Sequence, residues 1–147
     1  MCGGISRFGE VLQELFQTID VYDLKPNWGN IPINQRGKLI TANLKDIKKH
    51  LNANYYDCLW GTWALCYINL EDVDKVLAML FTALKEDGVL VLKEPILNKN
   101  RRETIPRICW TGQNMVVRSA AEIEKRLLKN FVIYRYKDIK QREGYDT

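Results

Sequence analysis

An apolar segment in the middle of the chain reads Tyr55-Tyr56-Asp57-Cys58-Leu59-Trp60-Gly61-Thr62-Trp63-Ala64-Leu65. Trp and Leu side chains occur on both of its faces and a long helical pattern follows it, so we predict a strand covered on both sides in an α/β sheet. Ligands of open α/β sheets bind beyond the carboxyl ends of the strands, here Gly61-Thr62-Trp63. The segment therefore suggests a binding site. In the alternative interpretation, Trp60 and Trp63 only fill the core and Gly61 makes room for a neighbour.

The composition predicts a single soluble domain over residues 1–147, because 46% of the residues are hydrophobic and 27% are charged. No apolar run reaches the roughly 18 residues that cross a bilayer, and no signal-peptide pattern is found, so we expect a cytoplasmic or nuclear protein without a membrane partner. Four cysteines lack metal-site spacing, which favours reduced thiols. The net charge of +4 permits an anionic partner without requiring one.

The chain begins with a glycine turn, Met1-Cys2-Gly3-Gly4-Ile5-Ser6-Arg7, in which Ser6 can cap the helix that follows. The apolar face expected for that helix consists of Phe8, Val11, Leu12, Leu15 and Phe16. Glycines at a helix start allow a ligand to approach the backbone, and the exposed N–H groups favour anionic or hydrogen-bond-accepting groups. A flexible N-terminus is the alternative.

A short strand is predicted over 18–24, with Asp23 near its end. Nucleotide-binding α/β folds place a ribose-binding carboxylate at the end of the strand that follows the glycine turn. The segment 25–37, interrupted by prolines and glycines, should be a loop with at most one helical turn. A third strand over 38–42 and a turn over 43–46 follow. The basic residues around His50 are most simply a solvated helix face.

The second half of the chain continues the alternation of helices and strands. Asn69 should cap a helix that ends at Gly88, with a buried face of Leu70, Val73, Leu77, Leu80, Phe81 and Leu84. A strand over 89–94 is stopped by Pro95, and a long irregular loop is expected from Ile96 to Arg118. Ser119 then caps a helix with Ile123 and Leu127-Leu128 on its inner side, and 131–136 reads as a last strand. This order predicts a largely parallel sheet.

Taken together, these segments resemble class I S-adenosylmethionine-dependent methyltransferases, which implies an α/β, Rossmann-like, three-layer fold with a mostly parallel sheet. The resemblance rests on Cys-Gly-Gly-Ile-Ser-Arg, Val-Tyr-Asp-Leu, Asn-Leu-Lys-Asp, Tyr-Asp-Cys-Leu-Trp-Gly-Thr-Trp-Ala-Leu and Gly-Val-Leu-Val-Leu-Lys-Glu, in that order. The nearest group is the protein α-N-terminal methyltransferases, which share the aspartate, the paired tryptophans and the Lys-acid strand end. The implied cofactor is S-adenosylmethionine, and the implied substrate is a protein or peptide.

The resemblance assigns roles to individual positions. Cofactor contacts fall on Gly3, Gly4 and Arg7 in the glycine loop, Asp23 and Leu24 at the ribose, Leu44 and Lys45 beside the adenine, and Thr62. Trp63 would line the substrate channel, with Tyr67 at a position where the family often has His. An aromatic wall suits the positive charge of a sulfonium.

The chain also departs from the family. Its glycine turn is one residue shorter, and Pro95 replaces the amide that follows the acid of the fifth strand. Between Leu97 and Arg118 the only acid is Glu103, whereas the family has an Asp that helps to deprotonate the substrate amine. Methyl transfer to an amine needs a base, so the catalytic residue is left unassigned, with Glu94 or a recruited water as candidates. The basic loop argues against Xaa-Pro-Lys peptides as substrates.

The chain is expected to lack the first, central strand and the last strand of the family's sheet. A sheet without its middle strand leaves backbone groups unpaired at about 1–3 kcal/mol each, so a longer gene product, a strand from a partner chain or an altered strand order would be needed. Three functions stay open: an active methyltransferase, a degenerate and inactive fold that serves as a structural or binding subunit, and an enzyme for a nucleic-acid acceptor. The last would use the basic loop residues Lys99, Arg101, Arg102, Arg107 and Trp110.

Overall fold

The structure is a computed structural model that describes residues 12, 14–24, 37–97, 105–108, 114–135 and 137. The elements in chain order are β1 (Val21–Asp23), β2 (Leu39–Thr41), the 3-10 helix η2 (Leu44–Lys49), β3 (Tyr56–Thr62), the 3-10 turn η3 (Leu65–Tyr67), α2 (Leu70–Ala83), β4 (Leu84–Lys93), β5 (Ile105–Ile108), β6 (Asn114–Val117) and α3 (Ala120–Leu127). The predicted glycine turn, the loop over 25–36 and the side chains of the basic loop lie outside the described residues.

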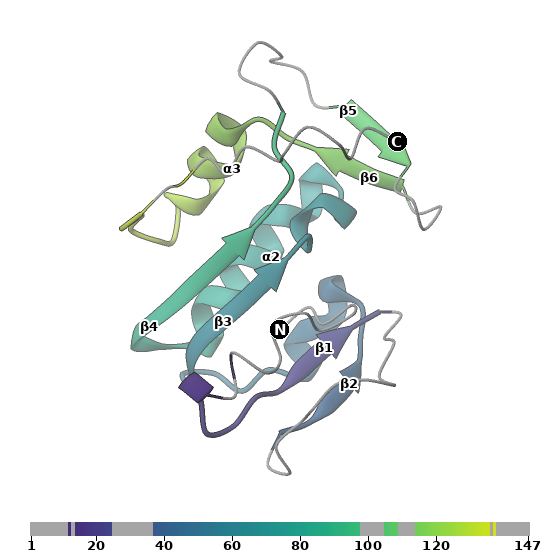
Figure 1. Cartoon of the computed structure of the whole chain (residues 1–147). Helices are drawn as coiled ribbons and strands as arrows, with labels where there is room; N and C mark the ends of the chain where they lie inside the picture. Colours follow the sequence, from purple (N-terminus) through teal and green to yellow (C-terminus); the bar gives the residue numbers. More distant parts are fainter. Residues whose placement is uncertain are drawn as a thin grey trace.

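The described strands form three two-stranded sheets (Figure 1). β1 pairs in parallel with β2, and β3 pairs in parallel with β4, whereas β5 and β6 are antiparallel. The arrows of β1 to β4 point the same way in Figure 1, so the carboxyl ends of these four strands lie toward one side of the molecule. This arrangement confirms the predicted parallel pairing within each of the two strand pairs, although the described residues of the two pairs form separate sheets and not the single sheet predicted.

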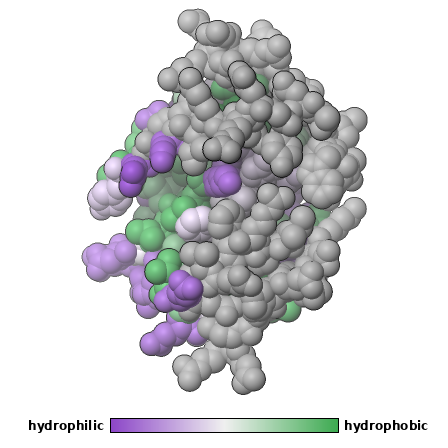
Figure 2. Space-filling model, viewed as in Figure 1, coloured by the Kyte–Doolittle hydropathy of each residue, from purple (hydrophilic) through white to green (hydrophobic). Residues whose placement is uncertain are grey.

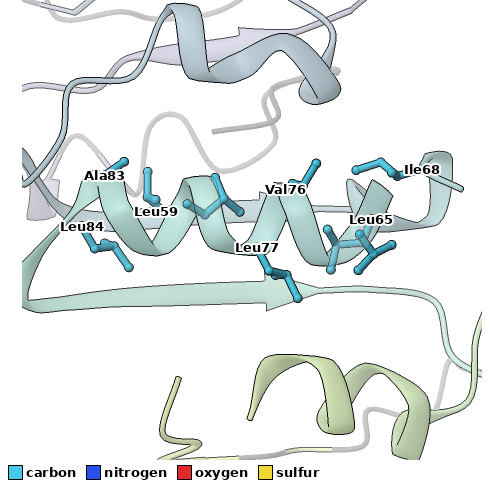
Figure 3. Packing of buried hydrophobic residues seen from close by; sticks show 9 residues of the cluster. Leu59, Leu65, Ile68, Val76, Leu77, Ala83 and Leu84 are labelled. Carbon is cyan, nitrogen blue, oxygen red and sulfur yellow. The ribbon is translucent and has the colours of Figure 1, made fainter. Parts of the chain in front are cut away.

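The main core lies between α2 and the β3–β4 pair (Figure 3). Val76 and Leu77 are fully buried, and Leu59 of β3 packs in the same cluster. The other face of β3 is only half-buried, so the strand is less completely covered than predicted. Two predicted members of the helix face are exposed instead, Leu70 by 40% and Phe81 by 51%, because the buried stripe is centred on Val76 and Leu77 and also takes in Ala83.

Helix α2 ends at Ala83, and the predicted end at Gly88 is wrong. Leu84 already has extended backbone angles and pairs with Tyr56 of β3, while its side chain is buried in the core. Lys85 and Glu86 have good helix propensity, but strand pairing and burial of Leu84 outweigh such weak local preferences. The extra residues of β4 are accommodated by an irregularity in the ladder between Tyr56 and Cys58.

The predicted loop from Ile96 to Arg118 contains a β-hairpin, which corrects the expectation of an irregular segment. Ile105 of β5 pairs with Val117 of β6, and Ile96 forms an isolated bridge with Arg118. Met115 and Val117 alternate inward and bury against Cys66 and Leu97. Proline and charges in this segment masked a strand pattern that is only four residues long.

The C-terminal segment differs from the prediction at its end. Ser119 caps α3 as expected, since its side chain accepts from the N–H of Glu122. The predicted strand over 131–136 is absent from the described residues 131–135: Phe131 packs on the core edge against Phe81, while Val132 and Tyr134 are 77% and 92% exposed. Figure 2 shows apolar and hydrophilic residues side by side on the side of the molecule where β4 and α3 lie.

The first predicted helix buries only part of its expected apolar face. Leu12 is buried, but Leu15 is 70% exposed, so the assignment of Leu15 to the apolar face is wrong. Its position three residues after Leu12 did not bring it onto the covered side. Among the helices of the described ranges, none has the length and apolar character that a membrane crossing requires.

Candidate functional site

The carboxyl end of β3 leads into a sharply bent segment that is held by β4. Trp63 adopts a left-handed backbone conformation with φ of 51°, which is unusual for a bulky residue, and its N–H donates to the carbonyl of Lys93 at 2.8 Å. The hydroxyl of Thr62 accepts a 3.0 Å hydrogen bond from the indole N–H of Trp60. The end of β3 thus places a hydroxyl and an indole at the predicted edge of the sheet.

The carboxylate of Glu94, directly after β4, binds the backbone that follows Trp63. Oε1 accepts from the N–H groups of Ala64 and Leu65 at 2.7 and 3.0 Å, and Oε2 accepts from the N–H of Cys66 at 3.1 Å. Burial raises the pKa of Glu94, and these three hydrogen bonds, which favour the charged form, offset part of that rise. Both oxygens of the candidate base are therefore engaged by the protein itself.

Arg118, directly after β6, binds the opposite end of the same turn. Nη1 donates to the carbonyl of Leu65 at 2.8 Å, and Nη2 donates to the carbonyl of Ile68. The residue is 3% exposed, and burial lowers the pKa of its guanidinium while the nearby Glu94 carboxylate opposes that change. Turn η3, which carries the predicted site residue Tyr67, is thus bound by an anion at its start and a cation at its end.

The remaining predicted cofactor residues belong to β1 and to the start of η2. Asp23 is half-buried at the end of β1, and its carbonyl accepts from the N–H of Ala42. Leu24 is 52% exposed, whereas Leu44 is half-buried and packs against the main core. Lys45 forms a 2.7 Å ion pair with Asp72 in the first turn of α2, which ties the segment after β2 to the segment after β3.

Two tyrosines connect the β1–β2 pair to the β3–β4 pair. The hydroxyls of Tyr22 and Tyr56 lie 2.9 Å apart, and Tyr22 also donates to the carbonyl of His50 at 3.2 Å. Tyr56 is at the beginning of β3, so this contact lies at the amino end of the strand, opposite Thr62. It helps to fix the position of β1, in which Asp23 directly follows Tyr22, relative to β3, whose far end carries Thr62.

The structure therefore brings part of the predicted site together. Thr62 and Trp63 lead into the turn whose N–H groups bind Glu94, and Tyr67 lies in the same turn. Lys45 is joined to the start of α2. Gly3, Gly4 and Arg7 lie outside the described residues, so their roles stay predictions. Among the residues that the structure describes, no three His, Cys, Asp or Glu side chains group as metal ligands do. Cys58 and Cys66 are free thiols, and burial raises the pKa of both.

The sequence did not indicate Arg118 or the Tyr22–Tyr56 pair as site-supporting residues. Arg118 stands in a basic segment, and only the buried neighbours Met115 and Val117 distinguish it from solvated arginines. Strand alternation gives no signal for Arg118, because it places this residue on the face of Val116 and not on the buried face of Met115 and Val117.

Comparison with known proteins finds similarity in structure only. No protein-family profile and no curated protein matches the sequence. A SAM-dependent methyltransferase from Leishmania major superposes with a TM-score of 0.70 at 20% identity, covering 88% of this chain and 52% of that chain. The 1,6-didemethyltoxoflavin-N1-methyltransferase of Burkholderia thailandensis, solved with its substrate and S-adenosylhomocysteine, gives a TM-score of 0.71 at 13% identity over 88% of this chain and 56% of its own.

A protein from Pyrococcus horikoshii gives a TM-score of 0.71 at 10% identity, covering 95% of this chain and 74% of that chain. This chain spans about half the length of the two methyltransferases. At identities this low, the superpositions establish the fold alone. The chain has the Rossmann-like fold of the class I S-adenosylmethionine-dependent methyltransferases, as the order of its segments predicts.

Proposed function

We propose that this protein binds S-adenosylmethionine at the carboxyl edge of β1 to β4. The observation that carries the proposal is the half-buried carboxylate of Asp23 at the end of β1, in a chain whose fold matches a SAM-dependent methyltransferase over 88% of its length. A carboxylate at this place accepts hydrogen bonds from the two hydroxyls of a ribose.

The neighbouring residues fit an adenosyl group. Leu24 is half exposed and Leu44 is half-buried, so both can offer apolar surface to an adenine ring. Lys45 is turned to Asp72, which leaves its aliphatic stem for packing. Thr62 and Trp63 stand at and directly after the end of β3, and an indole face suits a positively charged sulfonium.

The proposed activity is transfer of the sulfonium methyl group to an amine of a protein or peptide. Bound S-adenosylmethionine would supply an electrophilic methyl group, and the protein would align the acceptor with it. An amine acceptor must lose a proton, and both oxygens of Glu94 are held by backbone N–H groups. A water molecule at the site, rather than Glu94, is therefore the proton acceptor in this proposal.

The same engagement of Glu94 supports a second candidate function, in which the protein binds the cofactor without transferring its methyl group. Such a degenerate methyltransferase would act as a structural or binding subunit. The two candidates share the cofactor site and differ only in turnover.

Titration calorimetry with S-adenosylmethionine and S-adenosylhomocysteine tests the shared site. Asp23→Asn should weaken binding about 10- to 100-fold, because a hydrogen bond to a charged group contributes about 1.5–3 kcal/mol. The matched control is Asp57→Asn, since Asp57 is an exposed carboxylate at the amino end of β3 that pairs with Lys85. The proposal would be refuted if neither ligand gave heat of binding. It would also be refuted if the two substitutions weakened binding equally.

A methyl-transfer assay with labelled cofactor then separates the two functions. Peptides with a free α-amine are the acceptors to test, with the same peptides acetylated at the N-terminus as controls. Label in the free-amine peptides alone supports the amine methyltransferase. Cofactor binding without label in any peptide excludes these acceptors and supports the second candidate.

A further inference from the structure

The segment that joins β3 to α2 is held at both ends by charged side chains from different parts of the chain, the half-buried Glu94 and the buried Arg118. Glu94, from the end of β4, accepts the N–H groups of Ala64, Leu65 and Cys66. Arg118, from the end of β6, donates to the carbonyls of Leu65 and Ile68. These charges match the dipole of the turn, whose start presents N–H groups and whose end presents carbonyls.

The residue at the entrance of this segment is in a costly conformation. A non-glycine residue with positive φ, such as Trp63, persists only when its surroundings determine the backbone, at a cost of about 1–3 kcal/mol. One such determinant is the 2.8 Å bond from the N–H of Trp63 to the carbonyl of Lys93, the residue before Glu94. The indole packs against the small cluster of Cys66, Leu97, Met115 and Val117.

We infer that Glu94 and Arg118 are positioning residues that hold Trp63 and Tyr67 at the edge of the site. Neither charged group needs to touch a ligand for this role, because both bind the backbone of residues 64–68 directly. Arg118 makes one further, longer contact, from Nη1 to the carbonyl of Val116 at 3.4 Å. Tyr67 is 38% exposed and Trp63 is half-buried, so both keep surface for a ligand while their backbone is fixed. Assigning that ligand to the cofactor or its acceptor rests on the proposed function; the positioning itself does not.

The arrangement also couples the β5–β6 hairpin to the site. Arg118 directly follows β6, and Met115 and Val117 of the same strand bury against the residues that surround Trp63. A shift of β6 along its axis would move the guanidinium away from the carbonyls of Leu65 and Ile68. The hairpin therefore belongs to the support of the site, although it is more than thirty residues from Trp63 in the sequence.

The experiment measures Trp63 in the protein without any ligand. The chain has four tryptophans, so the fluorescence of Trp63 is obtained as the difference between the spectra of a protein with and without the Trp63→Phe substitution. Quenching of this difference signal by acrylamide reports the exposure of Trp63. In Glu94→Ala the difference emission should shift to longer wavelength and be quenched more readily. Glu86→Ala removes an exposed carboxylate from β4, the strand that Glu94 follows, and should leave the signal unchanged.

Two further variants keep the test decisive where Glu94→Ala does not fold. Glu94→Gln retains one carbonyl for Ala64 and Leu65 but turns an amide donor toward the N–H of Cys66, so quenching should lie between wild type and Glu94→Ala. Arg118→Lys cannot reach both carbonyls with the geometry of a guanidinium and should also increase quenching. Wild-type emission and quenching of Trp63 in folded Glu94 and Arg118 variants would overturn the inference.

Cofactor titrations of the same variants separate this inference from the proposed function. Where the wild type binds S-adenosylmethionine, Glu94→Ala should lower the affinity through the displaced Trp63. Where the wild type binds neither form of the cofactor, the proposed function fails, and the Trp63 signal still decides the positioning role.

Discussion

The hydroxyl of Tyr22 on β1 lies 2.9 Å from the hydroxyl of Tyr56 on β3 and joins two parallel strand pairs that form separate sheets. Tyr22 also approaches the carbonyl of His50 at 3.2 Å, and Tyr56 approaches Asp20 at 3.4 Å. Two hydroxyl protons cannot serve three contacts. The shorter distances favour a chain in which Tyr56 donates to Tyr22 and Tyr22 donates to His50. Burial raises the pKa of both phenols, which keeps these protons in place at neutral pH.

This relationship predicts coupling between Tyr22→Phe and Tyr56→Phe in a double-mutant cycle of urea unfolding. Each substitution should lower the free energy of unfolding, and the double variant should lose about 1 kcal/mol less than the sum, because the shared hydrogen bond is removed once. Tyr134→Phe is the control, since that ring is 92% exposed. Strictly additive losses would show that the two hydroxyls do not stabilise each other.

The main core predicts a large difference between two leucine truncations. Leu77→Ala removes a side chain that is 0% exposed at the centre of the cluster under β3 and β4, and it should cost about 2–5 kcal/mol. Leu128→Ala makes the same chemical change at a residue that is 59% exposed, and it should cost less than about 0.5 kcal/mol. Urea midpoints at constant slope measure both values. Similar losses would place Leu77 outside the core.

Two glycines of the central strand pair predict opposite tolerance to alanine. At Gly61 a Cβ would meet Cδ2 of Leu92 at 2.9 Å, the end of a side chain that can rotate. At Gly88 a Cβ would meet the carbonyl oxygen of Tyr56 at 2.9 Å and the backbone nitrogen of Lys85 at 3.0 Å, neither of which moves easily. Gly88→Ala should therefore cost about 1–3 kcal/mol and Gly61→Ala less, as thermal unfolding of the two variants would record. The reverse order would contradict the described ladder.

The arrangement of elements was largely predictable from the sequence, and the errors have a common cause. β1, β2, β3 and α3 stand where turn residues, caps and apolar runs indicate, because these signals are local. The end of α2 was misplaced because pairing of Leu84 with Tyr56 outweighs local helix propensity. The expected strand at 131–136 has the right composition, but a strand also needs a partner, and alternation alone does not supply one.

The location of the site at the carboxyl ends of the strands was predictable, whereas the hydrogen bonds that support it were not. Placing Thr62 and Trp63 at the end of a parallel strand followed from the order of the segments. That Glu94 binds three backbone N–H groups did not, because a sequence does not reveal whether an acid after a strand faces a ligand or its own chain. Arg118 was hidden for the same reason, since burial of a charge depends on packing between distant segments.

The raised pKa of Glu94 predicts a particular pH dependence. Its ordinary value is 4.5, and burial raises it in the folded protein, so the folded state binds this proton more tightly than the unfolded state. Between 4.5 and the raised value, the folded state carries more protons, and the stability contributed by the protonated group is lost as the pH rises. The free energy of unfolding of the wild type relative to Glu94→Gln should therefore fall as the pH is raised through this window.

Urea unfolding of both proteins at a series of pH values measures this difference, because the other titrating groups are common to both and cancel to a first approximation. Below 4.5 the difference should reach a plateau. A difference that rises with pH would mean that the three N–H groups and Arg118 stabilise the carboxylate by more than burial destabilises it. The pKa of Glu94 would then be lowered in the folded protein, contrary to the rise that burial produces.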